Sequence, residues 1–210
     1  MNIHKKLQKR IIDISFKLRL GHLGSCLSTL PILIEIYEKK KDDDIFILSN
    51  GHAGLALYVI LEYYCGEDAE ELFNKFGVHP KQSKENGIYC SGGSLGQGIT
   101  VGAGYAIVNP NKTIYILISD GEASEGSIWE SLKFFNESNL NNVEVYANLN
   151  GYSAINEVDL EYLSKCLTTF YPKINLRYTN VEVFKFLKGL EAHYKVMNEE
   201  DYKMALKELQ

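Results

Sequence analysis

The chain has little cysteine and no long apolar run. Its cysteines, Cys26, Cys65, Cys90 and Cys166, are widely spaced and form no C-x-x-C pair, which excludes the usual zinc and redox motifs. No apolar run approaches the roughly 18 residues that a membrane span requires, and the first residues do not read as a secretory signal. We therefore expect a soluble, cytoplasmic protein with free thiols and no membrane partner, in which Cys26 and Cys90 are small buried hydrophobic residues.

Positive charge is also in short supply. The 210 residues carry 22 Lys and Arg against 27 Asp and Glu, a formal net charge of −5. A protein that binds a nucleic-acid backbone needs a basic face, so nucleic acid is excluded as the main partner. Apolar residues make up 45% of the chain, which is ample for a core. The length fits one large domain or two very small ones, and with no internal repeat we expect a single domain over residues 1–210.

Segments with helical and strand-like patterns alternate along the chain. Strand-like runs lie at 45–48, 113–118, 142–147 and 174–178, and the first two are the apolar runs typical of buried strands. Helical spacing or capping predicts helices over 7–18, 28–37, 53–64, 66–76, 127–135, 159–166 and 199–209. A loop at 77–92 leads into a glycine-rich segment at 92–104 whose glycines allow a helix to pack closely. The alternation predicts an α/β fold, with a parallel sheet flanked by helices on both faces.

One stretch, Ser119-Asp120-Gly121-Glu122, follows a predicted buried strand and opens a predicted helix. The next predicted strand ends thirty positions after Asp120, at Asn150. Two neighbouring parallel strands would bring both residues to the edge of the sheet where ligands bind in open α/β folds. Asp is a hard oxygen ligand of the kind Mg²⁺ and Ca²⁺ prefer, and helix N-termini attract phosphate. This edge is therefore predicted to hold a phosphate through a metal ion, although Asp-Gly alone is also typical of a plain turn.

Histidine is scarce, yet four of the five histidines fall at the ends of predicted elements. They are His22, His52, His79 and His193. Imidazole is the side chain best suited to proton transfer near neutral pH. We expect these four residues to be catalytic, although each one taken singly would read as an ordinary surface or core histidine.

Five motifs occur in the order seen in transketolases. They are Gly21-His22-Leu-Gly24-Ser25, Ser49-Asn50-Gly51-His52-Ala53, Gly93-Ser-Leu-Gly96-Gln97-Gly98, Asp120-Gly121 with Glu125-Gly126, and Asn150-Gly151. Residues 1–155 therefore resemble the N-terminal, diphosphate-binding domain of that family, and residues 192–202 resemble its W-H-G-K-x-x-N segment. The resemblance implies a thiamine-diphosphate-binding fold, thiamine diphosphate as the cofactor, and transfer of a two-carbon ketol unit between sugar phosphates.

The resemblance also implies which residues bind the metal and the diphosphate. Asp120, Asn150 and the backbone carbonyl of Tyr152 would ligate Mg²⁺ or Ca²⁺, which would bridge the two phosphates. Gly121 would allow close approach of the diphosphate because it has no Cβ. Glu125, matched to the cofactor-binding set, would lie at a subunit contact in a carboxylate network.

Further cofactor contacts are implied for His52, Gly93, Leu95 and His193. The two histidines would contact the diphosphate or the thiazolium ring, and Gly93 and Leu95 would hold the aminopyrimidine. His22 and His79 would face the substrate's hydroxyl and carbonyl oxygens and move protons there.

The chain departs from the family pattern in three ways. Ser119 replaces the usual first Gly of the G-D-G motif, which changes the backbone near the metal without removing a ligand. The region between Asn150 and His193 is shortened, so at least one βα unit is missing after residue 155. The 210 residues show no counterpart of the family's pyrimidine-binding domain with its activating Glu, so we expect that domain on a partner. The resemblance thus implies one half of a split transketolase, paired with a pyrimidine-domain subunit in an assembly such as α₂β₂.

Two alternatives stay open. A related thiamine-dependent carboligase acting on pyruvate, as in deoxyxylulose phosphate synthesis, is disfavoured by the four histidines, because that branch lacks some of them. A non-catalytic paralogue that merely dimerises is disfavoured because Asp120, Asn150 and the histidines are all retained. A specialised role in building branched or unusual sugars fits the shortened chain.

Overall fold

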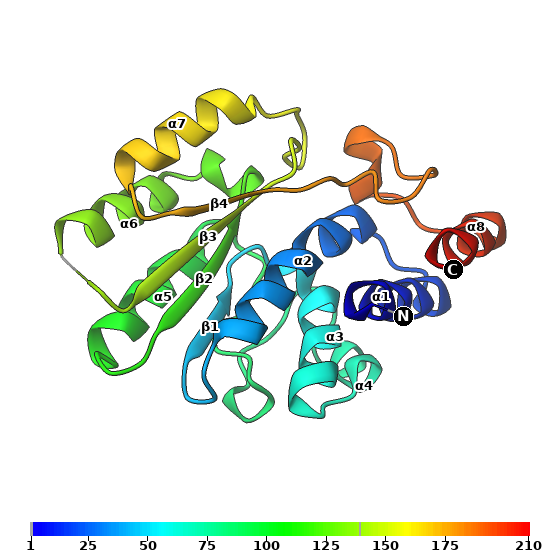
Figure 1. Cartoon of the computed structure of the whole chain (residues 1–210), viewed down its shortest axis with the longest axis horizontal. Helices are drawn as coiled ribbons and strands as arrows, with labels where there is room; N and C mark the ends of the chain where they lie inside the picture. The colour runs from blue at the N-terminus through cyan, green and yellow to red at the C-terminus, as the bar shows by residue number, and fades with distance from the viewer. Residues whose placement is uncertain (1, 139) are drawn as a thin grey trace.

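The centre of the structure, a computed structural model that describes residues 2–138 and 140–210, is a sheet of four parallel strands (Figure 1). In spatial order they are β1 (Ile45–Leu48), β2 (Ile114–Ser119), β3 (Val143–Leu149) and β4 (Asn175–Tyr178). All four strands were predicted within two residues of their observed bounds. The α/β fold with a parallel sheet is therefore confirmed.

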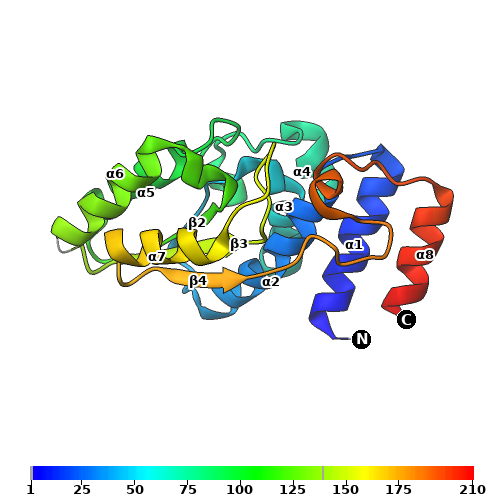
Figure 2. The ribbon, with the colours of Figure 1, turned by 90° about the horizontal axis from the view of Figure 1, so that it is seen from above.

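Helices cover both faces of the sheet (Figures 1 and 2). One face carries α5 (Gln97–Val108), α6 (Gly126–Glu137) and α7 (Leu160–Phe170). The other is covered by α2 (Leu23–Lys39), against which α1 (Ile3–Leu18) and α3 (Gly54–Cys65) pack. α4 (Ala69–Phe76) packs on α3, and α8 (Glu199–Leu209) packs on α1. Successive strand side chains point to opposite faces, so a strand covered on both sides must be apolar throughout. All six residues of β2 are buried accordingly.

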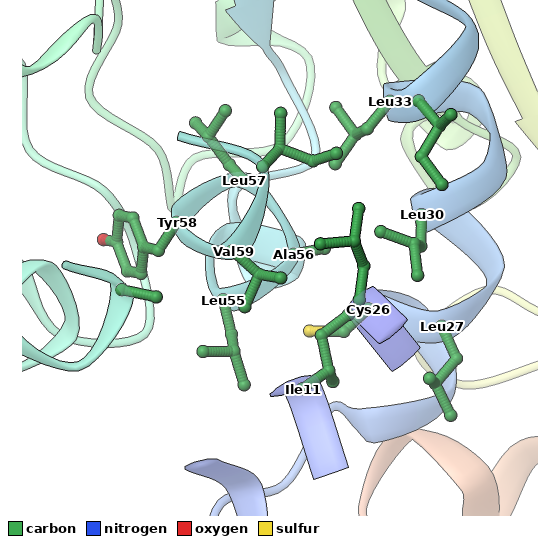
Figure 3. Packing of buried hydrophobic residues seen from close by; sticks show 14 of the residues in the cluster. Ile11, Cys26, Leu27, Leu30, Leu33, Leu55, Ala56, Leu57, Tyr58 and Val59 are labelled. Carbon is green, nitrogen blue, oxygen red and sulfur yellow. The ribbon is translucent and has the colours of Figure 1, made fainter. Parts of the chain in front are cut away.

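The core on the α2 side is built largely from the contact between α2 and α3 (Figure 3). Leu30 and Leu33 of α2 and Leu55 and Val59 of α3 belong to this cluster, and all four are at most 4% exposed. Each fully buried aliphatic side chain of this kind contributes about 1.5–3 kcal/mol. Cys26 fills a gap in the same cluster as a small hydrophobic residue, as predicted.

The predicted start of the second helix was wrong. α2 begins at Leu23 rather than near Ser28, so Pro31 lies inside the helix and Ser28 does not cap it. The Ser28 hydroxyl instead donates to the carbonyl of Ser25. Nearly every side chain from Leu23 onward is buried, and this packing outweighs the hydrogen bond that Pro31 cannot make. Five residues at the pocket end of α2 were thus missed as helical.

The glycine-rich segment forms the start of α5 and packs closely, as predicted. A Cβ on Gly98 would lie 2.5 Å from the Cα of Ser49, and one on Gly102 would lie 2.4 Å from Cδ1 of Ile116. The loop at 77–92 is also confirmed, with one short 3-10 turn inside it. Across residues 2–138 and 140–210, no helix is both long enough and apolar enough to cross a bilayer.

Candidate active site

A pocket of about 250 Å³ opens at the carboxyl ends of the strands. Its wall comes from the turns after β1, β2 and β3, the first turn of α2, the glycine-rich segment, and the 3-10 turn η4 (Gly189–His193). Ten of the predicted site residues line it: His22, His52, His79, Gly93, Leu95, Asp120, Gly121, Asn150, Tyr152 and His193. Glu125 is not in the wall; its side chain is exposed on the turn before α6.

Asp120 and Asn150 meet at this edge, as the strand pattern predicted. The pairing of Ser119 with Asn148 sets β2 and β3 in register. Oδ2 of Asp120 accepts the backbone N–H groups of Asn150 at 2.8 Å and Gly151 at 2.7 Å. Burial raises the pKa of Asp120 to about 6, although these backbone donors act to lower it. One carboxylate therefore joins the ends of two strands.

Asn150 has a fixed amide orientation. Its Nδ2 donates to the Ser28 hydroxyl at 3.3 Å, and its Oδ1 accepts the backbone N–H of Tyr152 at 3.0 Å. The Asp120 carboxylate, this amide oxygen and the Tyr152 carbonyl are all hard oxygen donors, the class that Mg²⁺ and Ca²⁺ bind. Across the described residues, no three His, Cys, Asp or Glu side chains gather closely enough to hold a metal ion. An ion at this edge would therefore depend on the amide and carbonyl oxygens.

Three of the four histidines form a cluster in the pocket wall. The ring centroids of His22 and His52 lie 5.7 Å apart, and those of His52 and His193 lie 6.2 Å apart. Burial, reinforced by the neighbouring histidines, lowers the pKa of His22 and His193 and lowers that of His52 to about 3. These three imidazoles are therefore neutral at pH 7. His79 is exposed, and its ring lies against Gly93.

The backbone of His22 has an unusual conformation that places it in this cluster. Its φ of 59° and ψ of 21° lie in the left-handed region, which few non-glycine residues adopt. Its backbone N–H donates to the carbonyl of His193 at 2.6 Å. That bond joins the start of α2 to η4, 171 positions further along the chain.

Three buried polar atoms in the pocket wall have no hydrogen-bond partner within the described residues. They are Nδ1 of His22, Oδ1 of Asn50 and Nε2 of His193. Leaving a buried polar group unpaired costs about 1–3 kcal/mol, so such groups are rare unless a ligand satisfies them. The turn at Gly121 packs closely against Ser153, because a Cβ added at Gly121 would lie 3.3 Å from the Cα of Ser153. The open positions fit a polar ligand, and the oxygen donors around Asp120 and Asn150 fit a divalent ion.

Residues 8–170 match the family described as transketolase, thiamine diphosphate binding domain. The chain belongs to the transketolase family. It is 33% identical over 159 residues to one of the apulose-4-phosphate transketolase subunits of Phocaeicola vulgatus, with 66% of this chain and 56% of that protein covered. It is 31% identical over 165 residues to a 6-deoxy-6-sulfo-D-fructose transketolase subunit from a Clostridium species, with 69% of this chain and 60% of that protein covered. The chain thus spans little more than half the length of these relatives.

Solved transketolases share the fold. The transketolase of Pichia stipitis in complex with sedoheptulose 7-phosphate has a TM-score of 0.83 at 17% identity, covering 100% of this chain and 41% of that one. The transketolase of Campylobacter jejuni has a TM-score of 0.77 at 21% identity, with 100% of this chain and 43% of that chain covered. At these identities the likeness establishes the architecture alone. The family and the fold predicted from the sequence are both confirmed.

Glu122 of this transketolase-family chain was not predicted from the motifs. Its side chain is fully buried, and its carboxylate accepts from the Ser49 hydroxyl at 2.6 Å, Gly96 N–H at 2.9 Å and Ser119 N–H at 3.1 Å. It thereby joins the turn after β1, the glycine-rich segment and the end of β2. Glu122 was given no role from the sequence, where its position directly after the Asp-Gly turn was the available signal.

Ser28 and Thr29 of α2 were also missed. The Thr29 hydroxyl accepts from Nδ2 of Asn50 at 3.3 Å and of Asn148 at 3.2 Å, and the Ser28 hydroxyl accepts from Asn148 and Asn150. All five side chains are at most 8% exposed. The two hydroxyls orient the amide groups behind the pocket. This role was missed because the helix was predicted to start at Ser28, five residues too late.

Proposed function

We propose that this chain is the N-terminal, diphosphate-binding subunit of a split thiamine-diphosphate-dependent transketolase, with residues 1–210 forming one domain. With a partner it would transfer a two-carbon ketol unit between sugar phosphates. The observation that carries the proposal is the convergence of Asp120, Asn150 and the histidine cluster on one pocket. That pocket lies in a chain whose matched region is the family's thiamine diphosphate binding domain.

Under this proposal, Mg²⁺ or Ca²⁺ would be held by Asp120, by Oδ1 of Asn150 and by the Tyr152 carbonyl. The metal would neutralise the diphosphate, and Gly121 would let the phosphates approach the start of the turn. Thiamine diphosphate supplies the nucleophilic carbon and electron sink that such a transfer requires. Gly93 and Leu95 would contact the aminopyrimidine.

The four histidines would divide the work of binding and proton handling. His52 and His193 would bind the cofactor, whereas His22 and the exposed His79 would face the substrate. An imidazole can accept a proton in its neutral form and return it from the imidazolium form, so these two would serve substrate hydroxyl and carbonyl oxygens.

The partner would be a pyrimidine-domain subunit, in an assembly such as α₂β₂. Support comes from the names of the apulose and sulfofructose relatives, both of which are transketolase subunits. It comes also from Glu125, whose exposed carboxylate on the turn beside Gly96 is available for a subunit contact. The relatives' substrates extend the candidate donors to less common sugars such as apulose 4-phosphate.

The first test needs this chain alone. Isothermal titration with thiamine diphosphate should show binding that requires Mg²⁺, whereas thiamine without phosphates should bind far more weakly. The second test adds a candidate protein carrying the pyrimidine domain, then follows two-carbon transfer from a panel of ketose phosphates by mass spectrometry. Turnover of pyruvate in place of ketose phosphates would overturn the assignment in favour of a related carboligase, and binding without any turnover would favour a non-catalytic role.

A further inference from the structure

Ser25 makes a buried contact with the histidine at the far end of the chain. Its hydroxyl oxygen lies 2.5 Å from Nδ1 of His193, and the serine is 1% exposed. Two features of the backbone hold the pair together. The N–H of His22 donates to the His193 carbonyl, and Gly24 leaves room for Ala192, whose Cβ would lie 2.8 Å from a Cβ added there. The contact therefore belongs to a closely packed interface between α2 and η4.

The positions of the protons follow from the available partners. Within the described residues, the Ser25 hydroxyl has no other hydrogen-bond partner, and Nε2 of His193 has none at all. If Nδ1 carried a proton and donated to Ser25, the buried hydroxyl proton would have no acceptor, at a cost of about 1–3 kcal/mol. An imidazolium would leave the same hydroxyl proton unpaired. If Ser25 donates to the Nδ1 lone pair, both atoms are satisfied and the single ring proton lies on Nε2.

We propose that Ser25 is a positioning residue that holds His193 in the neutral tautomer with its proton on Nε2. His193 lines the pocket and its Nε2 has no partner within the described residues, so this N–H is left free to donate to a ligand oxygen. The lone pair that could act as a base is on Nδ1, where the serine occupies it. His193 therefore donates a hydrogen bond to the ligand and does not abstract a proton from it. The identity of the ligand rests on the proposed function, in which the oxygen belongs to the diphosphate.

The direct test is nitrogen-15 NMR of the whole chain with labelled histidine, with His193 assigned by comparison with His193→Gln. The expected spectrum shows a protonated Nε2 and an unprotonated, hydrogen-bonded Nδ1. In Ser25→Ala the Nδ1 resonance should shift, because the lone pair loses its donor. Ser15→Ala is the matched control, since Ser15 is equally buried and its hydroxyl makes no hydrogen bond within the described residues. A proton on Nδ1 in the unmodified chain, or an unchanged Nδ1 resonance in Ser25→Ala, would overturn the assignment.

A binding measurement links the tautomer to the cofactor. Ser25→Ala should weaken Mg²⁺-dependent thiamine diphosphate binding about fivefold, the worth of one ordinary hydrogen bond, while leaving thiamine binding unchanged. Ser25→Thr retains the hydroxyl and should restore most of the affinity. Equal losses for thiamine and thiamine diphosphate would count against a donor aimed at phosphate. If the unmodified chain shows the expected tautomer but binds no thiamine diphosphate, the proposed function fails while the role of Ser25 stands.

Discussion

Replacing Glu122 by glutamine tests whether one buried carboxylate holds three segments of the pocket wall together. Both of its oxygens act as acceptors. One receives the Ser49 hydroxyl and the Gly96 N–H, and the other receives the Ser119 N–H. Burial raises the pKa of Glu122, while the Ser49 hydroxyl and the two backbone N–H donors act to lower it. Glutamine has nearly the same shape but only one acceptor oxygen.

The expected loss can be worked from these bonds. In either orientation, the glutamine NH₂ group faces at least one N–H or O–H donor that loses its acceptor. A buried donor without a partner costs about 1–3 kcal/mol. For a chain of this size, each kcal/mol lowers the Tm by about 2–4 °C, so a loss of about 2 kcal/mol corresponds to roughly 4–8 °C.

The assay is thermal and urea unfolding of three proteins: the unmodified chain, Glu122→Gln and Glu125→Gln. Glu125 is the matched control, because it lies one turn away and its side chain is exposed. Its substitution should change the free energy of unfolding by no more than about 0.5 kcal/mol. Glu122→Gln should also perturb the chemical shifts of Gly96 and Ser119. Equal stabilities for the two variants would refute the reasoning, since burial and hydrogen bonding would then not distinguish the two carboxylates.

Three further predictions address the site and its packing. Asp120→Ala should weaken Mg²⁺-dependent thiamine diphosphate binding more than about 100-fold, because losing a metal ligand should cost more than losing a residue that only orients one. Unchanged affinity in calorimetry would exclude this metal site. His79→Ala should lower kcat of the assembled enzyme by about 10²-fold or more through lost proton transfer, with cofactor affinity unchanged; a loss of affinity alone would show that its role is binding. Gly24→Ala should destabilise the chain by about 1–3 kcal/mol in urea unfolding, because its Cβ would meet Ala192. The control Gly126→Ala meets no atom within 4 Å and should be neutral or slightly stabilising.

The strands and the meeting of Asp120 with Asn150 could be predicted because local rules determine them. The apolar runs of β1 and β2 identify strands covered on both faces, and the length of one strand-helix-strand unit favours parallel pairing. Once β2 and β3 are neighbours, residues that follow each strand must share an edge. No distant part of the chain enters that inference.

The roles of Glu122 and Glu125 could not be separated in the same way. Both are acids near the start of a predicted helix, three positions apart. Which one is buried depends on where Ser49 and Gly96 come to lie, and those residues arrive from segments 26 and more positions away. The start of α2 was predicted wrongly for a related reason. Pro31 is a local signal for the first turn of a helix, and tertiary packing of the residues before it outweighed that signal.

The first turn of α2 carries a motif that supplies pocket side chains and also packs this turn against η4. His22 adopts a left-handed backbone and binds the His193 carbonyl, Gly24 makes room for Ala192, and Ser25 engages the His193 ring. A substitution at His22 or Ser25 therefore alters the pocket wall beside a contact with η4, and one at Gly24 alters such a contact. Loss of activity alone cannot assign a catalytic role to this motif. Only measurements that separate the tautomer of His193 and cofactor affinity from the free energy of unfolding can do so, because the same short segment sets all three.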